Sequence, residues 1–181
     1  MKKLLEKDGS IFWLLVPGKD VRLRSQFQEL RYRTFRKEDR NATGKETDAY
    51  DAHADYIVCM KKGKMVGGCR MIFGKIEELP IGKAATKTNT MPSMEISRLI
   101  ADSTQTKCLL FSLIYKQAEK RGVDQILAFA RRGLVKMLQK EKLDVFKILG
   151  EPYEYRGLTL VPLAFRVSSA PSFIKKHLKE M

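Results

Sequence analysis

The chain has 181 residues and a mass of 20.8 kDa, which is the size of one domain, and its hydrophobic fraction of 44% indicates a packed core rather than a disordered chain. It carries 35 Lys and Arg against 21 Asp and Glu, a formal net charge of +14. This charge indicates a polyanionic partner, such as nucleic acid, an anionic membrane surface, a phosphorylated cofactor or an acidic protein, and does not choose among them.

Cysteine and histidine usage excludes several kinds of site. Cys59, Cys69 and Cys108 are odd in number and show no C-x-x-C spacing, which argues against a disulfide framework and a structural zinc site. The chain has two histidines, so we expect no metal site and no Ser-His-Asp triad. No apolar run approaches the roughly 20 residues that span a bilayer. We therefore expect a cytoplasmic protein without a membrane span.

The first half of the chain reads as a strand, a helix and an antiparallel hairpin. Apolar residues from Val21 onward recur at helical spacing, and Pro17-Gly18 ends the apolar run before them. Gly67-Gly68 inside a strand predicts a bulge or a close approach of another backbone. The expected elements are a strand at 11–16, a helix from 21 to 35, a loop at 38–48, strands at 56–60 and 65–73, and a mobile excursion at 74–93.

The second half alternates strands with helices. Gly122 is predicted to stop the first of these helices. The expected elements are a strand at 94–101, a helix at 109–121, a strand at 125–130, a helix at 131–142, strands at 144–149 and 158–167, and a short helix in the tail. No repeat or linker divides the chain. We therefore expect one domain over residues 1–181, of mixed α/β class, with helices flanking a central sheet.

Charged residues on predicted central strands form the candidate site. Each has an ordinary structural interpretation, as an N-cap, a surface ion pair or a helix-end contact. Charges on central strands are costly to bury unless they are partnered, so a shared polar network is the more economical interpretation. The residues concerned are Arg31 and Phe35 on one helix face, Asp48 and Asp51 before a strand, Arg70 in the hairpin, and Glu95 and Arg98 in the next strand.

The spacing of Glu95 and Arg98 leaves one point open. Strict strand alternation puts the two side chains on opposite faces of the sheet. Either a bulge brings them together or Arg98 acts from the other face.

Read in order, these motifs resemble the acyl-homoserine-lactone (autoinducer) synthases. The runs are L-R-Y-R-T-F at 30–35, E-T-D-A-Y-D at 46–51, Y-I-V at 56–58, G-C-R at 68–70 and E-I-S-R-L at 95–99. The resemblance covers about residues 30–100 and implies an acyltransferase with a GNAT-like fold. It implies that Arg31 and Phe35 belong to the amino-substrate pocket, Asp48 and Asp51 to an acidic pair joined by Arg70, Glu95 to the general base, and Arg98 to the strand motif.

One departure from the family pattern bears on the amine substrate. The characteristic Trp of the S-adenosylmethionine pocket would fall at Asn41, and the one tryptophan of the chain is Trp13. The related N-acyl amino acid synthases, which use the same fold and an acyl-carrier donor, are therefore the better match. A true acyl-homoserine-lactone synthase using S-adenosylmethionine remains the alternative.

The chemistry of N-acylation agrees with these residue types. An α-amine is protonated at neutral pH and must lose a proton, to a carboxylate or to a carboxylate-bound water, before it attacks a thioester. A substrate carboxylate favours an arginine. No cysteine nucleophile is required, and Cys69 is expected to be a buried small hydrophobe.

The acyl donor is expected to be an acyl-phosphopantetheine thioester on an acyl-carrier protein, with no permanently bound cofactor. Residues 102–108 contain no glycine, unlike the pyrophosphate loop of coenzyme A-dependent GNAT enzymes, and carrier proteins are acidic. Arg132, Lys136 and Lys140 form an i, i+4, i+8 stripe that is either a docking face for the carrier or a solvated face. The apolar residues Leu110, Leu113, Ile126, Phe129 and Leu138 either line an acyl tunnel or fill the core.

Two further interpretations come from other classes. The charge is compatible with a nucleic-acid-binding module, but the sequence has no helix-turn-helix, RNA-recognition or zinc signature. The other interpretation is a catalytically inactive scaffold with a GNAT-like fold.

Overall fold

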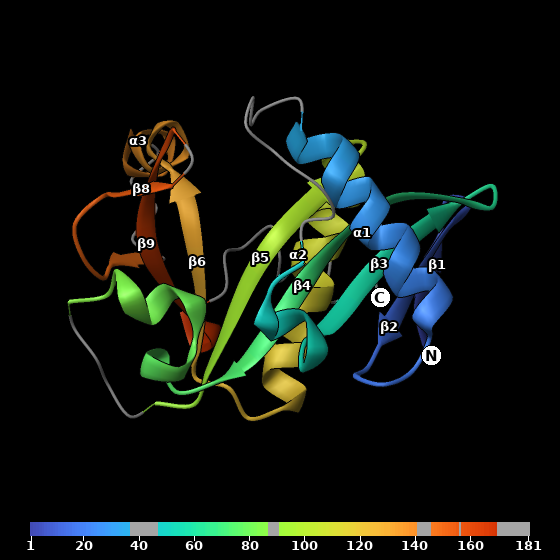
Figure 1. The fold of residues 1–181 in the computed structure, drawn as a ribbon, viewed down its shortest axis with the longest axis horizontal. Helices are drawn as coiled ribbons and strands as arrows, with labels where there is room; N and C mark the ends of the chain where they lie inside the picture. Colours follow the sequence, from blue (N-terminus) through green and yellow to red (C-terminus); the bar gives the residue numbers. More distant parts are fainter. Residues whose placement is uncertain (37–46, 87–90, 141–145, 156, 170–181) are drawn as a thin grey trace.

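The computed structural model describes residues 1–36, 47–86, 91–140, 146–155 and 157–169, which form a nine-stranded sheet with helices on both faces (Figure 1). The strands are β1 (Lys2–Lys7), β2 (Ser10–Leu15), β3 (Asp55–Lys61), β4 (Lys64–Gly74), β5 (Ser93–Ala101), β6 (Gln125–Arg131), β7 (Phe146–Ile148), β8 (Tyr153–Tyr155) and β9 (Leu158–Arg166). The helices are α1 (Val21–Arg36), α2 (Thr104–Lys120) and α3 (Arg132–Lys140), with short 3-10 turns η1 (Ala49–Ala52), η2 (Ile76–Glu78), η3 (Pro80–Lys83) and η4 (Val167–Ser169).

The sheet is antiparallel except at one junction. Its order is β1-β2-β3-β4-β5-β6-β9-β7, and β8 pairs with β9. Strands β5 and β6 are parallel, with pairs running from Ser93 and Gln125 to Ile96 and Ala128. Both strands continue for several residues after this pairing ends. The expected mixed α/β architecture with a central sheet is confirmed.

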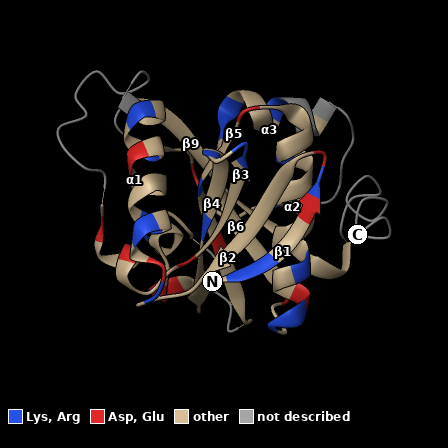
Figure 2. Cartoon of the chain, turned by 90° about the vertical axis from the view of Figure 1, so that its right-hand side faces the viewer, with Lys and Arg blue, Asp and Glu red and all other residues tan. Residues whose placement is uncertain are grey.

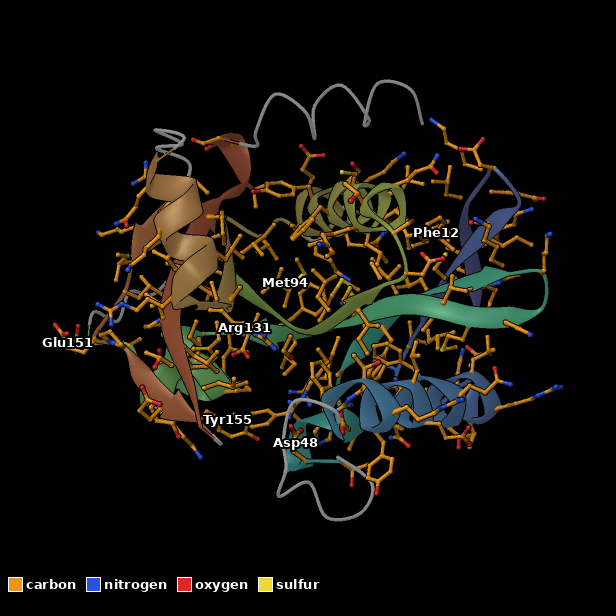
Figure 3. All side chains as sticks on the ribbon, turned by 90° about the horizontal axis from the view of Figure 1, so that it is seen from above. Phe12, Asp48, Met94, Arg131, Glu151 and Tyr155 are labelled. Carbon is orange, nitrogen blue, oxygen red and sulfur yellow. The ribbon has the colours of Figure 1, made fainter. Side chains whose placement is uncertain are left out.

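Each face of the sheet carries its own apolar core. Helix α2 packs on one face over a cluster that includes Phe12 and Met94, and α1 packs on the other over a cluster that includes Phe27 and Tyr56. Figure 2 shows the strands between these two helices, and Figure 3 places Phe12 and Met94 on the α2 side and Asp48 on the α1 side. Charged groups on the α1 side therefore lie against a largely apolar layer, where ion pairs are strengthened.

Several predicted elements differ from the observed ones. Strands β1 and β8 were not predicted, and α2 begins at Thr104 rather than at 109 because Ser103 caps it by accepting a hydrogen bond from the Thr106 N–H at 3.1 Å. The predicted helix at 131–142 is observed as α3, and the predicted tail helix lies outside the described residues. The residues proposed to fill the core or line a tunnel include Leu110, Leu113 and Ile126, which are buried, and Phe129, which is half-buried; the side chain of Leu138 lies outside the described residues.

The excursion at 74–93 was predicted to be mobile, and for its described part this prediction was wrong. Residues 76–83 form η2 and η3, and the side chains of Ile76, Leu79 and Ile81 are fully buried against the α1-side core. Three apolar anchors spaced among the polar residues make this segment a packed turn. Figure 1 shows it as short turns between β4 and β5.

The glycine pair of β4 confirms the predicted close approach. A Cβ on Gly68 would lie 2.6 Å from the Ile57 carbonyl oxygen and 2.8 Å from the Phe27 ring. We expect Gly68→Ala to lower the free energy of unfolding by roughly 1–3 kcal/mol, because neither the central strand nor the buried ring can retreat. Urea unfolding of this variant should be compared with Gly133→Ala in α3, where a Cβ meets nothing within 4 Å. Equal stability of the two variants would contradict this packing.

Candidate active site

One buried carboxylate, Asp51, joins three elements of the fold. Its Oδ1 accepts hydrogen bonds from Arg31 Nη1 of α1 at 2.9 Å, from Arg70 Nη1 of β4 at 2.8 Å and from the Tyr56 hydroxyl of β3 at 2.8 Å. Burial raises the pKa of Asp51, but the charge of Arg31 and the hydrogen bonds together outweigh burial and lower it to about 2. Asp51 is therefore an ionised hub at neutral pH.

The spacing of Asp48 and Asp51 has a local cause. The Oδ1 of Asp48 accepts a hydrogen bond from the Tyr50 N–H at 3.0 Å, and the Oδ2 of Asp51 accepts one from the Asp48 N–H at 3.0 Å. This capping box fixes the turn η1 before β3. Asp48 is therefore an N-cap, and it also accepts a hydrogen bond from Arg70, so both structural interpretations of this residue hold.

Arg24 supports the same turn and was not among the predicted site residues. Its guanidinium donates to the Asp51 carbonyl at 3.1 Å and to the Ala54 carbonyl at 2.7 Å, and it lies 4.7 Å from the Tyr56 ring centre. Arg24 precedes Arg31 by two helical turns, so both lie on the face of α1 that meets the sheet. That spacing was the signal by which it could have been found.

Arg70 extends the network from the acidic pair to β5. Its Nη1 also donates to Asp48 Oδ1 at 2.6 Å, and its Nε donates to Ser97 Oγ at 3.0 Å. The β4–β5 register pairs Arg70 directly with Ser97, so the two side chains share one face.

A β-bulge answers the question that strand alternation left open. Arg70 pairs with Ser97 and Gly68 with Ile100, so two residues of β5 lie opposite one residue of β4. Arg98, one of these two, has a positive φ of 57°. Its guanidinium lies 5.7 Å from the Phe35 ring centre, on the α1 side of the sheet. The bulge therefore brings Arg98 to the same face as Glu95.

Glu95 is a buried carboxylate of β5 whose pKa is near neutral. It is 1% exposed, and its Oε2 accepts a hydrogen bond from the Ile81 backbone N–H at 2.8 Å. Burial raises the pKa of Glu95 to about 7, against the opposing effects of the Ile81 hydrogen bond and the charge of Arg70. A carboxylate with this pKa can accept and release a proton under physiological conditions.

Arg31 is fully buried and only partly satisfied within the described part of the chain. Its Nη1 binds Asp51, while its Nε and Nη2 have no acceptor among the described residues. Buried donors of this kind are rare in native proteins and suit an acceptor supplied by a ligand.

Other predicted positions lie apart from this network. Arg132 and Lys136 are exposed on α3, and the side chain of Lys140 lies outside the described residues, as does Asn41. Cys69 is fully buried on the α2 side, and burial raises the pKa of its thiol to about 12. The expectation that Cys69 is a buried hydrophobe is confirmed.

Two properties of the described residues concern metals and membranes. No group of three or more His, Cys, Asp or Glu side chains among them is arranged to hold a metal ion. None of the described helices is long and apolar enough to cross a bilayer.

Comparison with known proteins places this geometry in a familiar fold. Residues 30–107 match the family model of the acetyltransferase (GNAT) domain. The structure is similar to that of the AHL synthase LasI, with a TM-score of 0.69 and 16% identity over 88% of this chain and 91% of that chain. No curated protein sequence matches the chain.

Two further solved structures show the range of relatives. The CoA-dependent acyl-homoserine lactone synthase BjaI, solved with SAM and isopentyl-CoA, has a TM-score of 0.69 and 16% identity over 95% of this chain and 89% of that chain. FeeM, an N-acyl amino acid synthase from uncultured soil microbes, has a TM-score of 0.61 and 13% identity over 95% of this chain and 98% of that chain. The predicted GNAT-like fold, shared with both kinds of synthase, is confirmed.

Proposed function

We propose that this protein is an N-acyltransferase that moves a fatty acyl group from a thioester to the amine of an amino acid or a related small molecule. The observation that carries this proposal is Glu95, a buried carboxylate with a pKa of about 7 beside the Asp48–Asp51–Arg70 network. The GNAT fold and its synthase relatives support the same reaction class.

The residues take distinct roles in this reaction. Glu95 accepts a proton from the substrate ammonium group, and the freed lone pair attacks the thioester carbonyl. Arg70 holds the acidic pair of Asp48 and Asp51 in place, and the exposed edge of Asp48 offers a partner for the ammonium group before it loses its proton.

The Arg31 donors that find no acceptor among the described residues suit a substrate carboxylate, and Phe35 and Arg98 lie on the same face of the sheet. This arrangement fits an amino acid, which carries both an amine and a carboxylate.

The amine acceptor has a second candidate. AHL synthases are prominent among the structural relatives, and BjaI was solved with SAM. An ordinary amino acid is favoured because Asn41 stands where the family pattern has the tryptophan of the S-adenosylmethionine pocket. Mass spectrometry of the product separates the two acceptors, since one gives an N-acyl amino acid and the other a lactone.

For the donor, we propose an acyl-carrier protein. At the start of α2, the Ser103 hydroxyl accepts a hydrogen bond from the Thr106 N–H at 3.1 Å, and the Thr106 hydroxyl donates to Asp102 Oδ1 at 2.6 Å. A carboxylate at this helix end, with no glycine in residues 102–108, disfavours the pyrophosphate of free coenzyme A. BjaI is CoA-dependent, so a direct comparison of donors is needed.

Charge reversal on α3 tests the carrier. We expect Arg132→Glu combined with Lys136→Glu to raise KM for an acyl-carrier-protein thioester about tenfold at low salt, because two exposed cations are lost from the docking face. KM for the matching acyl-coenzyme A should stay within about twofold. Lys107→Glu combined with Lys116→Glu, exposed on α2, is the matched control. An unchanged KM for the carrier thioester would remove α3 as the docking face.

A further inference from the structure

A packed turn between β4 and β5 contacts Glu95, the proposed base, although the turn lies outside the sequence motifs that define the site. This turn, residues 76–86, contains η2 and η3. Its three buried anchors pack with Leu127 of β6 and Leu149 in the α1-side core. It therefore sits on the same face of the sheet as Glu95, over the junction where β5 pairs with β6.

One polar group of the turn enters the site. The Ile81 backbone N–H donates to Glu95 Oε2 at 2.8 Å, and both residues are buried. Pro80 begins η3 and has no N–H, and the first N–H groups of a helical turn have no partner within that turn. The sequence Pro80-Ile81 thus presents one free donor, and the buried Ile81 side chain fixes its direction.

Close packing and hydrogen bonds around the turn hold this donor in place. A Cβ on Gly82 would lie 2.4 Å from the Ile76 carbonyl oxygen, and a Cβ on Gly150 would lie 2.2 Å from the Ala84 carbonyl oxygen. Downstream, the Thr86 N–H and hydroxyl both donate to the Leu149 carbonyl at 3.1 Å. These contacts hold the turn in place independently of Glu95.

Apart from burial, the other groups that shift the ionisation of Glu95 act through their charge. Arg70 of β4 and Arg98 of β5 favour the ionised carboxylate, and Asp48 before η1 opposes it. The Ile81 amide differs from these groups because it is neutral and engages a specified oxygen. A directional contact orients a carboxylate, whereas a charge at a distance does not.

We propose that the Ile81 amide is the positioning group of the acyl transfer: it holds Oε2 of Glu95 and leaves Oε1 to take the proton of the substrate ammonium group. This inference rests on the proposed function. In the balanced step, the ammonium group loses one proton to Glu95, nitrogen forms its bond to the thioester carbon, and the carbon–sulfur bond breaks. The nitrogen loses two protons over the whole reaction. One ends on the thiol of the leaving group, and the other is released to solvent.

The test removes the single N–H and keeps every side chain. Incorporation of the α-hydroxy analogue of isoleucine at position 81 replaces this amide by an ester. The matched control is the same replacement at Gly82, whose N–H donates to the Leu79 carbonyl at 2.9 Å in the same turn. Two measurements are made on the whole protein. The first is an NMR titration of the ¹³C-carboxyl resonance of Glu95, which is assigned because it disappears in Glu95→Gln. The second is the pH dependence of kcat/KM.

We expect the ester at 81 to raise the pKa of Glu95 by about one unit, because the ionised form loses a hydrogen-bond donor. The acidic limb of kcat/KM should move to higher pH by the same amount, giving about tenfold lower kcat/KM on that limb. The ester at 82 should change neither. An unchanged titration with the ester at 81, or equal shifts with both esters, overturns the proposal.

Further outcomes separate this inference from the proposed function and from a folding defect. If the parent protein forms no acylated product, the proposed function fails, whereas the titration still reports the contact. Ile81→Val, which shortens the anchor and keeps the N–H, should leave the pKa of Glu95 unchanged. Should the ester at 81 not fold, Gly82→Ala displaces the same amide, and an unshifted pKa in that variant overturns the proposal.

Discussion

Replacing Glu95 by glutamine is expected to lower kcat by about 10²–10⁴-fold without unfolding the protein. Glutamine has nearly the same size, and its side-chain oxygen can still accept the hydrogen bond from the Ile81 N–H. What it loses is the ability to take a proton from the amine. The measurement is initial-rate kinetics with an acyl thioester and saturating amine, beside Glu119→Gln, an exposed glutamate of α2, as the control.

Stability should change in the opposite direction to activity. Because the folded-state pKa of Glu95 is raised from 4.5 to about 7, the folded protein binds its proton more tightly than the unfolded chain does. The unfolding free energy therefore falls as pH rises through this window, by on the order of 3 kcal/mol. Glu95→Gln should remove that decline and be at least as stable as the parent at pH 8. Undiminished activity in this variant would contradict the role of Glu95.

The second large effect concerns Asp51. We expect Asp51→Asn to lower the free energy of unfolding by about 3–5 kcal/mol, because the buried cations Arg31 and Arg70 lose their shared counter-charge. This corresponds to a fall in Tm of roughly 10 °C for a chain of this length. Thermal unfolding followed by circular dichroism measures it.

Asp48→Asn is the matched control for this change. Asp48 is about one-third exposed, and asparagine caps a helical turn as well as aspartate does, so the unfolding free energy should change by about 1 kcal/mol or less. Activity should still fall, because Arg70 and the substrate amine lose a carboxylate. Equal loss of stability in both variants would show that Asp51 is not the hub of the network.

The pKa of Asp51 adds a pH signature. Because it is lowered from 3.8 to about 2, the stabilisation from this carboxylate is present above pH 3.8 and is lost as pH falls through about 2. Asp51→Asn should therefore flatten the acid limb of the stability profile, whereas Glu95→Gln flattens the limb between pH 4.5 and about 7.

Much of the fold was readable from local patterns. The helical spacing after Val21 predicted α1, and the glycine pair in β4 predicted the close approach at Gly68. Strand β1 was missed because four of its six residues, Lys2–Lys7, are charged, as is common for an edge strand. Strand β8 is three residues long and was too short to give a periodic signal.

The sequence predicted which residues belong to the site but not how they are arranged. The motifs named Arg31, Asp51 and Arg70 as one network, and the structure brings them within hydrogen-bond distance. The bulge at Arg98 could be stated only as one of two alternatives, since a positive φ in a strand depends on the register of the neighbouring strand. The Ile81 amide was beyond sequence reasoning, because a backbone donor leaves no mark in the side-chain pattern.

The most direct test of the central claim is mass spectrometry of lipid extracts from bacteria that express either this protein or its Glu95→Gln variant. The proposed N-acyltransferase activity predicts an N-acylated amino acid in the first extract and its absence from the second. An acyl-homoserine lactone instead would keep the acyl transfer and replace the amine acceptor. No acylated amine in either extract, with the protein folded and an acyl-carrier protein present, would contradict the claim and leave a GNAT-like scaffold without this activity.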